Sequence, residues 1–354
     1  MIIKYIKKIL RPLKLTDLRN FITDYLESKK RLKIIALGSE LKAFKKVRIS
    51  VKRNTFNEYI QLQSSDRLGV INKTIFATTL NPDINVIINS PNAYVPLNSK
   101  LKENWLIHIE PPGYIQKLGY NKEKLHNNYT RVYTCDPTLY NKGGKYIASP
   151  PFVHWHLEIS SYNKGKLELL HDYNFLKSQV LAPDKTSGLA VINSNIYSLP
   201  GHKLRADFIT ALCNSKFDFN LYGGSKWSKF NQYVDTAPRG KWPIYSTSRY
   251  ILVIENEVAP YYWSEKITDA ILCWSMPIYF GCPNLCDYLP KGSYINLDIT
   301  QKDAINKLQK IVESDYYETN LDNLAKAREL ILDKYNLLNF IDQELNDHIN
   351  KKKS

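Results

Sequence analysis

The sequence has few cysteines and no long apolar run, and both absences narrow the classes of protein it can encode. Five cysteines are present, an odd number without regular spacing, which argues against a disulfide scaffold and fits a reducing compartment. No run of about 20 apolar residues reads as a transmembrane helix. Nor does an uninterrupted apolar core of about 7–15 residues follow the first charges, so the pattern is not that of a signal peptide.

What the chain does contain is ordinary globular composition over a considerable length. Its 354 residues are more than an ordinary single domain contains and would suit two domains of about 150 residues each. With 44% hydrophobic and 23% charged residues, the chain can bury a sizeable core, and disorder is not expected.

Positive charge is concentrated at one end. Residues 1–53 hold sixteen of the 49 Lys and Arg and four of the 34 Asp and Glu, so this end carries +12 of the net +15. Within residues 1–15, isoleucines and leucines recur at roughly helical spacing with lysines between them, the pattern of a basic amphipathic helix. Contact with a membrane surface is the favoured interpretation. Packing on the protein's own core and nucleic-acid binding are the alternatives, and no nucleic-acid partner is expected.

Apolar runs and turn signals predict an α/β chain with two parallel sheets. In the first half, strands are expected over 33–37, 47–51, 85–88, 105–109 and 131–134. In the second half, strands are expected over 189–192, 219–222, 250–254, 276–280 and 294–297, and helices over 201–213, 264–274, 303–313, 320–334 and 337–350. The helix over 201–213 should bury Leu204, Phe208, Ile209 and Leu212 on one face. Residues 141–188 look like a linker with an irregular aromatic surface.

Four regions follow from these signals. We expect a basic helical segment over 1–33, a first Rossmann-like domain over 34–180, a second over 181–335, and a C-terminal helix with a basic tail over 336–354. Two Rossmann-like domains that face a cleft form the GT-B arrangement.

Polar side chains follow the apolar run 251–254 where a parallel strand should end. Ligands of such sheets bind just beyond the carboxyl ends of strands, so Glu255 and Asn256 are placed for binding. Ser264 is a natural N-cap for the next helix, whose N-terminus attracts anions. Lys266 adds a positive charge beside a diphosphate, and Glu265 can accept hydrogen bonds from sugar or ribose hydroxyls. The structural alternative is a capped helix with an exposed Glu-Lys pair.

The longer stretch from Arg249 to Pro283 is a more specific functional signal than the Glu-Lys pair alone. Ile-Glu-Asn at 254–256, Tyr-Trp-Ser-Glu-Lys at 262–266 and Met-Pro-Ile-Tyr-Phe-Gly-Cys-Pro at 276–283 resemble the fucosyltransferases of glycosyltransferase family 10. The donor motif of that family runs Phe-Glu-Asn, a short loop, Tyr-x-Thr-Glu-Lys, a helix, and Pro-(Ile/Val)-x-x-Gly. The match covers residues 249–297 and extends more loosely back to about residue 188. Ile254 and Ser264 depart from the motif conservatively, and Trp274-Ser275 stands where a small residue and Gly are frequent.

The resemblance implies a set of donor ligands for GDP-fucose. Arg205, on a helix that follows Ser194-Asn195, matches the family's phosphate-binding Arg. By the same match, Lys266 is its phosphate partner, Glu265 and Asn256 hold ribose or sugar hydroxyls, and Tyr262 lines the donor pocket.

An inverting transfer also needs a carboxylate that takes the proton of the acceptor hydroxyl. Glu110 ends the buried strand 105–109 of the first domain, and the resemblance implies a general base in a comparable strand-end Glu. His108, two residues back, is the competing candidate. A Glu that ends a strand before a Pro-rich turn is the structural alternative.

We expect no metal ion or other cofactor. His154 and His156 could share one face of a strand, but no third ligand is evident. Asp-x-Asp, which metal-dependent transferases of the other common fold usually carry, is absent from the sequence. Neutralisation of the diphosphate by Arg205 and Lys266 is therefore favoured.

The resemblance implies an inverting α-1,3/1,4-fucosyltransferase that acts on a GlcNAc or glucose hydroxyl of a glycan. A lipopolysaccharide or capsule-type acceptor would fit a cytoplasmic enzyme held at the inner face of a membrane by residues 1–15. A GT-B transferase for another nucleotide sugar and a non-catalytic glycan- or nucleic-acid-binding protein are the alternatives.

Overall fold

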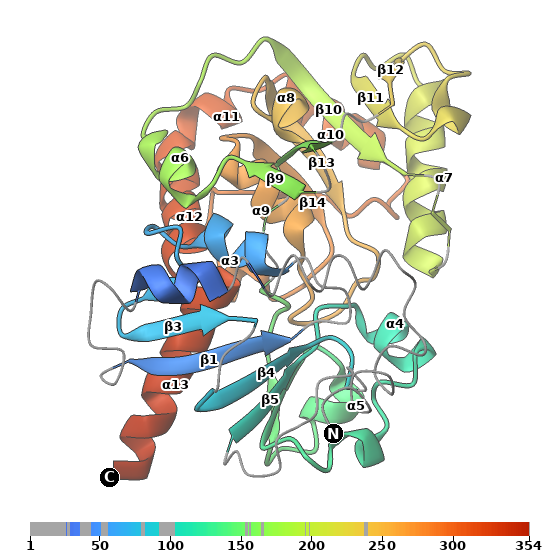
Figure 1. The fold of residues 1–354 in the computed structure, drawn as a ribbon. Helices are drawn as coiled ribbons and strands as arrows, with labels where there is room; N and C mark the ends of the chain where they lie inside the picture. Colours follow the sequence, from blue (N-terminus) through green and yellow to red (C-terminus); the bar gives the residue numbers. More distant parts are fainter. Residues whose placement is uncertain are drawn as a thin grey trace.

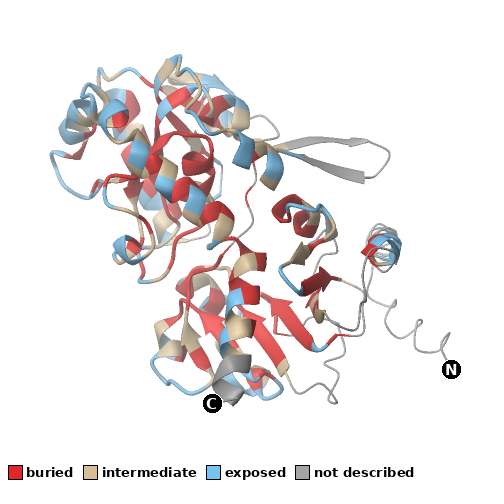
Figure 2. Cartoon of the chain, turned by 90° about the vertical axis from the view of Figure 1, so that its left-hand side faces the viewer, coloured by how far each residue is buried: buried red, intermediate tan, exposed pale blue. Residues whose placement is uncertain are grey.

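The chain forms two α/β domains, each built on a mainly parallel sheet (Figure 1). This confirms the predicted α/β class and its two Rossmann-like domains, the arrangement called GT-B. Buried residues are concentrated in the strands of both domains (Figure 2). The computed structural model describes residues 26, 29–35, 44–50, 56–78, 82–91, 103–152, 155, 157–163, 166–194, 196–197, 199–236 and 240–353.

The first domain contains a seven-stranded sheet in the order β2-β3-β1-β4-β5-β6-β7. The β2–β3 pair is antiparallel and the other pairs are parallel. All residues of β4 are buried, as expected for a strand covered on both faces. The strands are β1 (Lys45–Ser50), β2 (Val70–Ile71), β3 (Thr74–Ala77), β4 (Ile84–Ile88), β5 (Glu103–Ile107), β6 (Arg131–Thr134) and β7 (Tyr146–Ala148). The connecting helices are α3 (Phe56–Gln63), α4 (Pro112–Lys117), η2 (Glu123–His126) and α5 (Pro137–Tyr140).

The second domain contains a six-stranded parallel sheet in the order β12-β11-β10-β13-β14-β15. Its strands are β10 (Ser187–Asn193), β11 (Asn220–Gly223), β12 (Tyr233–Asp235), β13 (Ser248–Ile254), β14 (Met276–Phe280) and β15 (Ile295–Asn296). Its helices are α7 (Pro200–Asn214), η3 (Ser225–Trp227), α8 (Trp242–Tyr245), α9 (Glu265–Leu272), η4 (Leu285–Asp287), α10 (Ala304–Val312), α11 (Tyr316–Thr319) and α12 (Leu321–Asp333).

The order of this second sheet creates a position suited to ligand binding. From β10 the chain builds outward through β11 and β12, and then returns to the other side of β10 with β13. The connections after β10 and β13 therefore leave the sheet in opposite directions. The crevice between them, at the carboxyl ends of the strands, is where open α/β sheets bind ligands.

Two segments connect the domains. The antiparallel hairpin of β8 (Glu158–Asn163) and β9 (Lys166–Leu170), followed by α6 (Tyr173–Ser178), lies between the two sheets in the sequence. The last helix, α13 (Leu337–Lys353), returns to the first domain (Figure 1). There Asp342 Oδ1 accepts a hydrogen bond of 2.5 Å from Thr74 Oγ1, and Glu344 Oε2 accepts one of 2.9 Å from Tyr133.

Most predicted strands and helices are present, and three predictions are wrong. Residues 33–35, expected in a strand, belong to a helical stretch over 29–35. Arg31 and Ile35 are buried together, at 4% and 6% exposure, while Lys33 between them is exposed. Strand alternation would have placed all three residues on one face, whereas helical spacing separates Lys33 from the other two. Leu204, expected in the core, is 36% exposed on α7.

Residues 141–188, expected to be a linker, contain β7, the β8–β9 hairpin and α6. Short strands and a six-residue helix have too few residues to show a clear period, which explains why this stretch looked irregular. The predicted amphipathic segment over 1–15 lies outside the described residues. Among the residues that the structure describes, no helix is long and apolar enough to cross a membrane.

Candidate functional site

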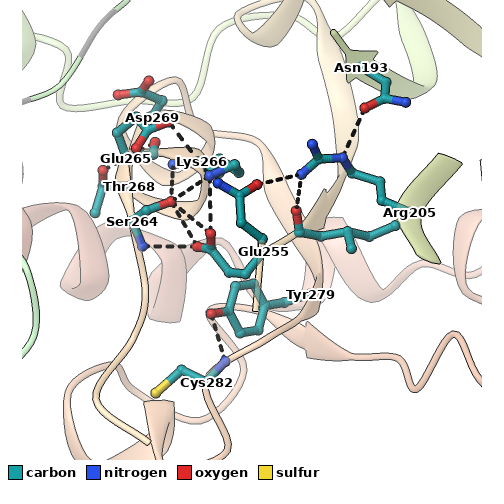
Figure 3. Close-up of polar contacts among 12 residues, drawn as sticks. Asn193, Arg205, Glu255, Ser264, Glu265, Lys266, Thr268, Asp269, Tyr279 and Cys282 are labelled. Carbon is teal, nitrogen blue, oxygen red and sulfur yellow. Dashed lines mark hydrogen bonds and ion pairs between the residues drawn. The ribbon is translucent and has the colours of Figure 1, made fainter. Parts of the chain in front are cut away.

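Arg205 lies at the crevice between β10 and β13. It projects from α7, is 8% exposed, and its Nε donates to Asn193 Oδ1 at 2.9 Å. Its Nη1 donates to Ile254 O and to Asn256 Oδ1, both at 3.0 Å (Figure 3). Within the described residues, no hydrogen bond involves Nη2. Burial lowers the pKa of Arg205, while Glu255 acts to raise it.

A glycine allows α7 to approach the end of β13 this closely. A Cβ on Gly201 would lie 2.0 Å from the backbone oxygen of Asn256, a separation that real Cβ atoms do not adopt. Without a side chain, the first turn of α7 packs directly against the 256–257 backbone. This contact places Arg205, one turn further along α7, beside the ends of both strands.

Glu255 is buried and hydrogen-bonded to neighbouring residues of the site. Its carboxylate is 2% exposed and accepts hydrogen bonds from Ser264 N at 2.9 Å, Ser264 Oγ at 2.8 Å and Lys266 Nζ at 3.2 Å (Figure 3). The sequence pointed to Glu255 as a donor ligand, but these partners occupy both of its oxygens. Glu255 instead fixes the first turn of α9 and the ammonium of Lys266.

Gly281 is needed at the same point. A Cβ on Gly281 would lie 2.6 Å from Cγ of Glu255 and 2.5 Å from the hydroxyl of Tyr279. That hydroxyl accepts a 2.9 Å hydrogen bond from Cys282 N. The glycine that ends the resemblance motif therefore has a packing reason here, since it leaves room for the buried Glu255 side chain.

Glu265 is held between two lysines at the start of α9. Its Oε1 lies 3.8 Å from Lys266 Nζ and 3.8 Å from Lys241 Nζ. Lys241 also pairs at 2.7 Å with Asp269, whose side chain is fully buried. Burial acts to lower the pKa of Lys241, but Asp269 and Glu265 raise it above its usual value. The carboxylate oxygens of Glu265 can accept hydrogen bonds from hydroxyls.

These side chains line a pocket of about 160 Å³ at the carboxyl edge of β10 and β13. Small-molecule sites have volumes of roughly 300–1,000 Å³, so this pocket is smaller than a site that encloses a whole small-molecule ligand. Arg205, Lys241, Glu265 and Lys266 are its charged lining residues, beside Tyr245 and Ser194. Asn195, named with Ser194 in the sequence, lies outside the described residues.

Asn256 and Tyr262 do not line this pocket. Asn256 contacts the site through its hydrogen bond to Arg205. Tyr262 is 2% exposed and packs with Ile115 and Cys135 of the first domain. Burial raises the pKa of Tyr262 well above its usual value, with Glu255 and Glu265 adding to the effect. Tyr262 thus takes part in the contact between the domains.

Glu110 follows β5 on the first domain. Burial raises the pKa of Glu110 above its ordinary value of 4.5, as does the negative charge of Glu265, while Lys266 lowers it. Glu265 and Lys266 begin α9 of the second domain, so charges of that domain act on the Glu110 carboxyl.

His108, the competing base, is inside the first domain. It has no exposed surface, and its Nδ1 lies 3.1 Å from Thr134 Oγ1. Burial, together with the neighbouring His126, lowers the pKa of His108 to about 3. A neutral ring in the core does not contact the cleft, so His108 has a packing role.

Sequence reasoning missed Lys241, Tyr245 and Asn193. None of them belongs to the contiguous motif, and Lys241 precedes a helix of only four residues. A possible signal is that Lys241 follows Gly240 in a polar loop, but many surface loops share that feature. In the part of the chain that the structure describes, no three His, Cys, Asp or Glu residues are grouped to hold a metal ion. His154 and His156 lie outside that part.

No protein-family model matches this sequence, and no curated protein does. Among solved structures, the chain is similar to an α1,3-fucosyltransferase at 18% identity and a TM-score of 0.49, over 79% of this chain and 82% of that one. It is also similar to a structure of α1,3-fucosyltransferase with GDP-fucose, at 16% identity and a TM-score of 0.46, over 82% of this chain and 91% of that one. A third similar structure is Anabaena HepE in complex with UDP-glucose, at 11% identity and a TM-score of 0.49, over 87% of this chain and 99% of that one. At these identities and TM-scores the similarities assign neither family nor activity, so the side chains of the site must carry the functional argument.

Proposed function

We propose that this protein is an inverting glycosyltransferase that transfers fucose from GDP-fucose to a hydroxyl of a GlcNAc- or glucose-containing glycan. The observation that carries this proposal is one arrangement of charges. Arg205 and Lys266 line a pocket at the switch point of the second sheet, and Lys266 and Glu265 act electrostatically on the carboxyl of Glu110, which belongs to the other domain. A cationic donor site opposed by a half-buried base is what a nucleotide-sugar transferase requires.

The donor diphosphate binds to Arg205 and Lys266. Guanidinium and ammonium groups form strong charge-assisted hydrogen bonds with phosphate, and the N-terminus of α9 adds its partial positive charge. Glu265 accepts hydrogen bonds from sugar or ribose hydroxyls, and Asn256 acts through Arg205. Because two side-chain cations neutralise the diphosphate, no metal ion is required in this proposal. Turnover in the presence of excess EDTA tests that point.

Glu110 acts as the general base. Its carboxylate takes the proton of the acceptor hydroxyl while the hydroxyl oxygen forms a bond to the anomeric carbon. The bond from that carbon to the diphosphate oxygen breaks, and its electron pair leaves with GDP. Arg205 and Lys266 stabilise the negative charge that develops on the leaving oxygen. Attack from the side opposite the diphosphate inverts the anomeric configuration.

The fucose assignment and the α-1,3/1,4 linkage rest on the donor motif between Arg249 and Pro283. Arg205, Glu265 and Lys266 recognise a diphosphate and hydroxyls and do not distinguish fucose from another sugar. The basic pattern of residues 1–15 supports an enzyme held at the inner face of a membrane, beside a lipid-linked glycan acceptor.

Release of GDP from GDP-fucose, with and without a panel of glycan acceptors, tests the proposed function. We expect acceptor-stimulated release with a GlcNAc- or glucose-containing glycan. Preferential turnover of another nucleotide sugar would replace fucose and retain the transferase. Binding of liposomes or DNA without any affinity for GDP would favour a non-catalytic binding protein.

A further inference from the structure

The loop that joins β13 to α9 carries the donor motif and also contacts the first domain. Its residue Glu257 accepts a hydrogen bond of 2.8 Å through Oε2 from the backbone N–H of Gly113. Tyr261 packs edge-on against Tyr140 with ring centroids 5.4 Å apart. Ala259 and Tyr262 belong to one buried cluster with Ile115 and Cys135. The loop is therefore a contact element between the two domains.

Both ends of this loop are fixed in the proposed donor site. At one end, Asn256 accepts a hydrogen bond from Arg205. At the other end, Ser264 donates to Glu255 and caps α9. Between them, the N–H of Tyr261 donates to Asn284 at 2.8 Å. A displacement of the middle of the loop is therefore opposed by groups that also hold the cations of the pocket.

On the first domain, the contact lies close to Glu110 along the chain. Glu110 is followed by Pro111, Pro112 and Gly113. Proline rings fix φ, so the two prolines restrict how Gly113 can move relative to Glu110. Pro111 has the extended backbone of a helix N-cap, at φ −64° and ψ 155°. Holding the N–H of Gly113 thus limits the positions open to the carboxylate of Glu110.

The absence of a side chain on Gly113 permits this close contact. A Cβ there would lie 2.9 Å from Glu257 Oε2 and 3.6 Å from its Cδ. The carboxylate of Glu257 is half-buried; burial raises its pKa, the N–H of Gly113 lowers it, and Asp136 raises it. The bond to Gly113 is the one hydrogen bond found for the Glu257 carboxylate within the described residues.

We propose that Glu257 is a positioning residue, which sets Glu110 against the donor site by holding Gly113. The proposal rests on the function proposed above, because it assigns the relative placement of base and donor. Glu257 is not among the residues that line the pocket. Its contribution is geometric, and misplacing a catalytic group by about 1 Å can reduce turnover roughly 100-fold.

The test compares Glu257→Ala with Glu257→Gln. Alanine removes the acceptor for the Gly113 N–H, whereas the amide oxygen of glutamine can still accept it. We expect kcat with acceptor to fall about 10- to 100-fold in Glu257→Ala, while the Kd for GDP changes less than about twofold. Glu257→Gln should retain kcat within about threefold of the starting protein. Gly113→Ala, which pushes on Glu257 from the other side, should reproduce the loss.

A pH profile supplies a readout that a merely structural role would not move. In Glu257→Ala, Glu110 should be more hydrated, so its raised pKa should fall and the acidic limb of kcat/KM should shift to lower pH. The groups facing Glu110 across the cleft, Glu265 and Lys266, are unchanged in this variant. An unshifted limb, equal losses in the Ala and Gln variants, or a parallel loss of GDP affinity would each overturn the proposal.

Hydrogen exchange separates this proposal from the proposed function. The amide of Gly113 should be protected in the full-length protein and in Glu257→Gln, and should exchange faster in Glu257→Ala. Unchanged protection would refute the contact whatever the enzyme's activity. If the starting protein neither bound GDP nor turned over a nucleotide sugar while the exchange difference appeared, the function would fail and the domain contact would stand.

Discussion

The two sides of the cleft are built differently. On the second domain, Glu255, Glu265, Lys266, Lys241 and Asp269 form a continuous set of ion pairs around the pocket. On the first domain, Glu110 stands three residues beyond the end of β5, and His108 is buried in the core. Binding an anionic donor needs several charges whose positions depend on one another. Removing a proton needs one carboxylate with a suitable pKa, placed by its backbone.

The largest effect on catalysis should come from a change on the first domain, at Glu110. Glu110→Gln removes the base while keeping the size and polarity of the side chain. We expect kcat to fall about 10²- to 10⁴-fold because general base catalysis is lost, with the Kd for GDP unchanged. Steady-state kinetics and calorimetry measure both. Glu123→Gln, at an exposed ion pair on the same domain, is the matched control. A Glu110→Gln variant with full transferase rate would remove Glu110 as base.

A change among the ion pairs of the second domain should weaken the binding of GDP. In Lys266→Gln the amide can still donate to the buried Glu255, but the charge beside the diphosphate is gone. We expect the affinity for GDP to fall about 10- to 100-fold, the loss typical of a charge-assisted hydrogen bond. Lys310→Gln, an exposed lysine of α10, controls for the change in net charge. If both variants bound GDP equally well, Lys266 would not be a phosphate ligand.

The pH dependence links the two sides. Because burial and Glu265 raise the pKa of Glu110, its protonated, inactive form persists to higher pH than for an ordinary carboxyl. We expect kcat/KM to fall about tenfold per pH unit on the acidic side, with a midpoint above the ordinary value of 4.5. Glu265→Gln removes one cause of the raised pKa and should shift this midpoint to lower pH. A shift to higher pH would contradict the coupling across the cleft.

The smallest catalytic effect should come from Lys241, the pocket lysine outside the motif. In Lys241→Gln, Glu265 loses one of its two cations, and we expect the KM for donor to rise about two- to fivefold. The free energy of unfolding should fall by about 1–3 kcal/mol because the buried Asp269 loses its charged partner.

A double variant separates the two effects of Lys241. Lys241→Gln with Asp269→Asn should recover part of the stability, measured by denaturant unfolding, without restoring the KM. The reason is that Glu265 still lacks its second lysine. Full recovery of KM in the double variant would show that Lys241 acts through stability alone.

Sequence reasoning works best where neighbouring residues in the chain are neighbours in space. The apolar run of β13, the N-cap Ser264 and Lys266 are all within one strand–loop–helix unit, so periodicity and capping signals locate them. The sequence also predicts the buried strand before Glu110, although β5 ends at Ile107, three residues before Glu110. The expected family and donor came only from a resemblance.

Contacts between residues that are far apart in the chain could not be predicted from the sequence. Lys241 reaches Asp269 and Glu265 only because α8 packs beside β13, and Glu257 reaches Gly113 only because the domains touch. The surroundings of Glu255 could not be predicted for the same reason. A carboxylate after a strand is typical of a ligand, and only the fold shows that Ser264 and Lys266 donate hydrogen bonds to its oxygens here.

The return of α13 to the first sheet has a consequence for the order in which the chain can be completed. Asp342 accepts hydrogen bonds from Asn72 and Thr74, about 270 positions earlier, and Phe340 packs on Tyr133 with ring centroids 5.3 Å apart. Domains usually fold as they leave the ribosome, the earlier one first. Here the first sheet lacks the contacts of α13 until α13 has been synthesised, so the first domain cannot be completed before the second domain has left the ribosome.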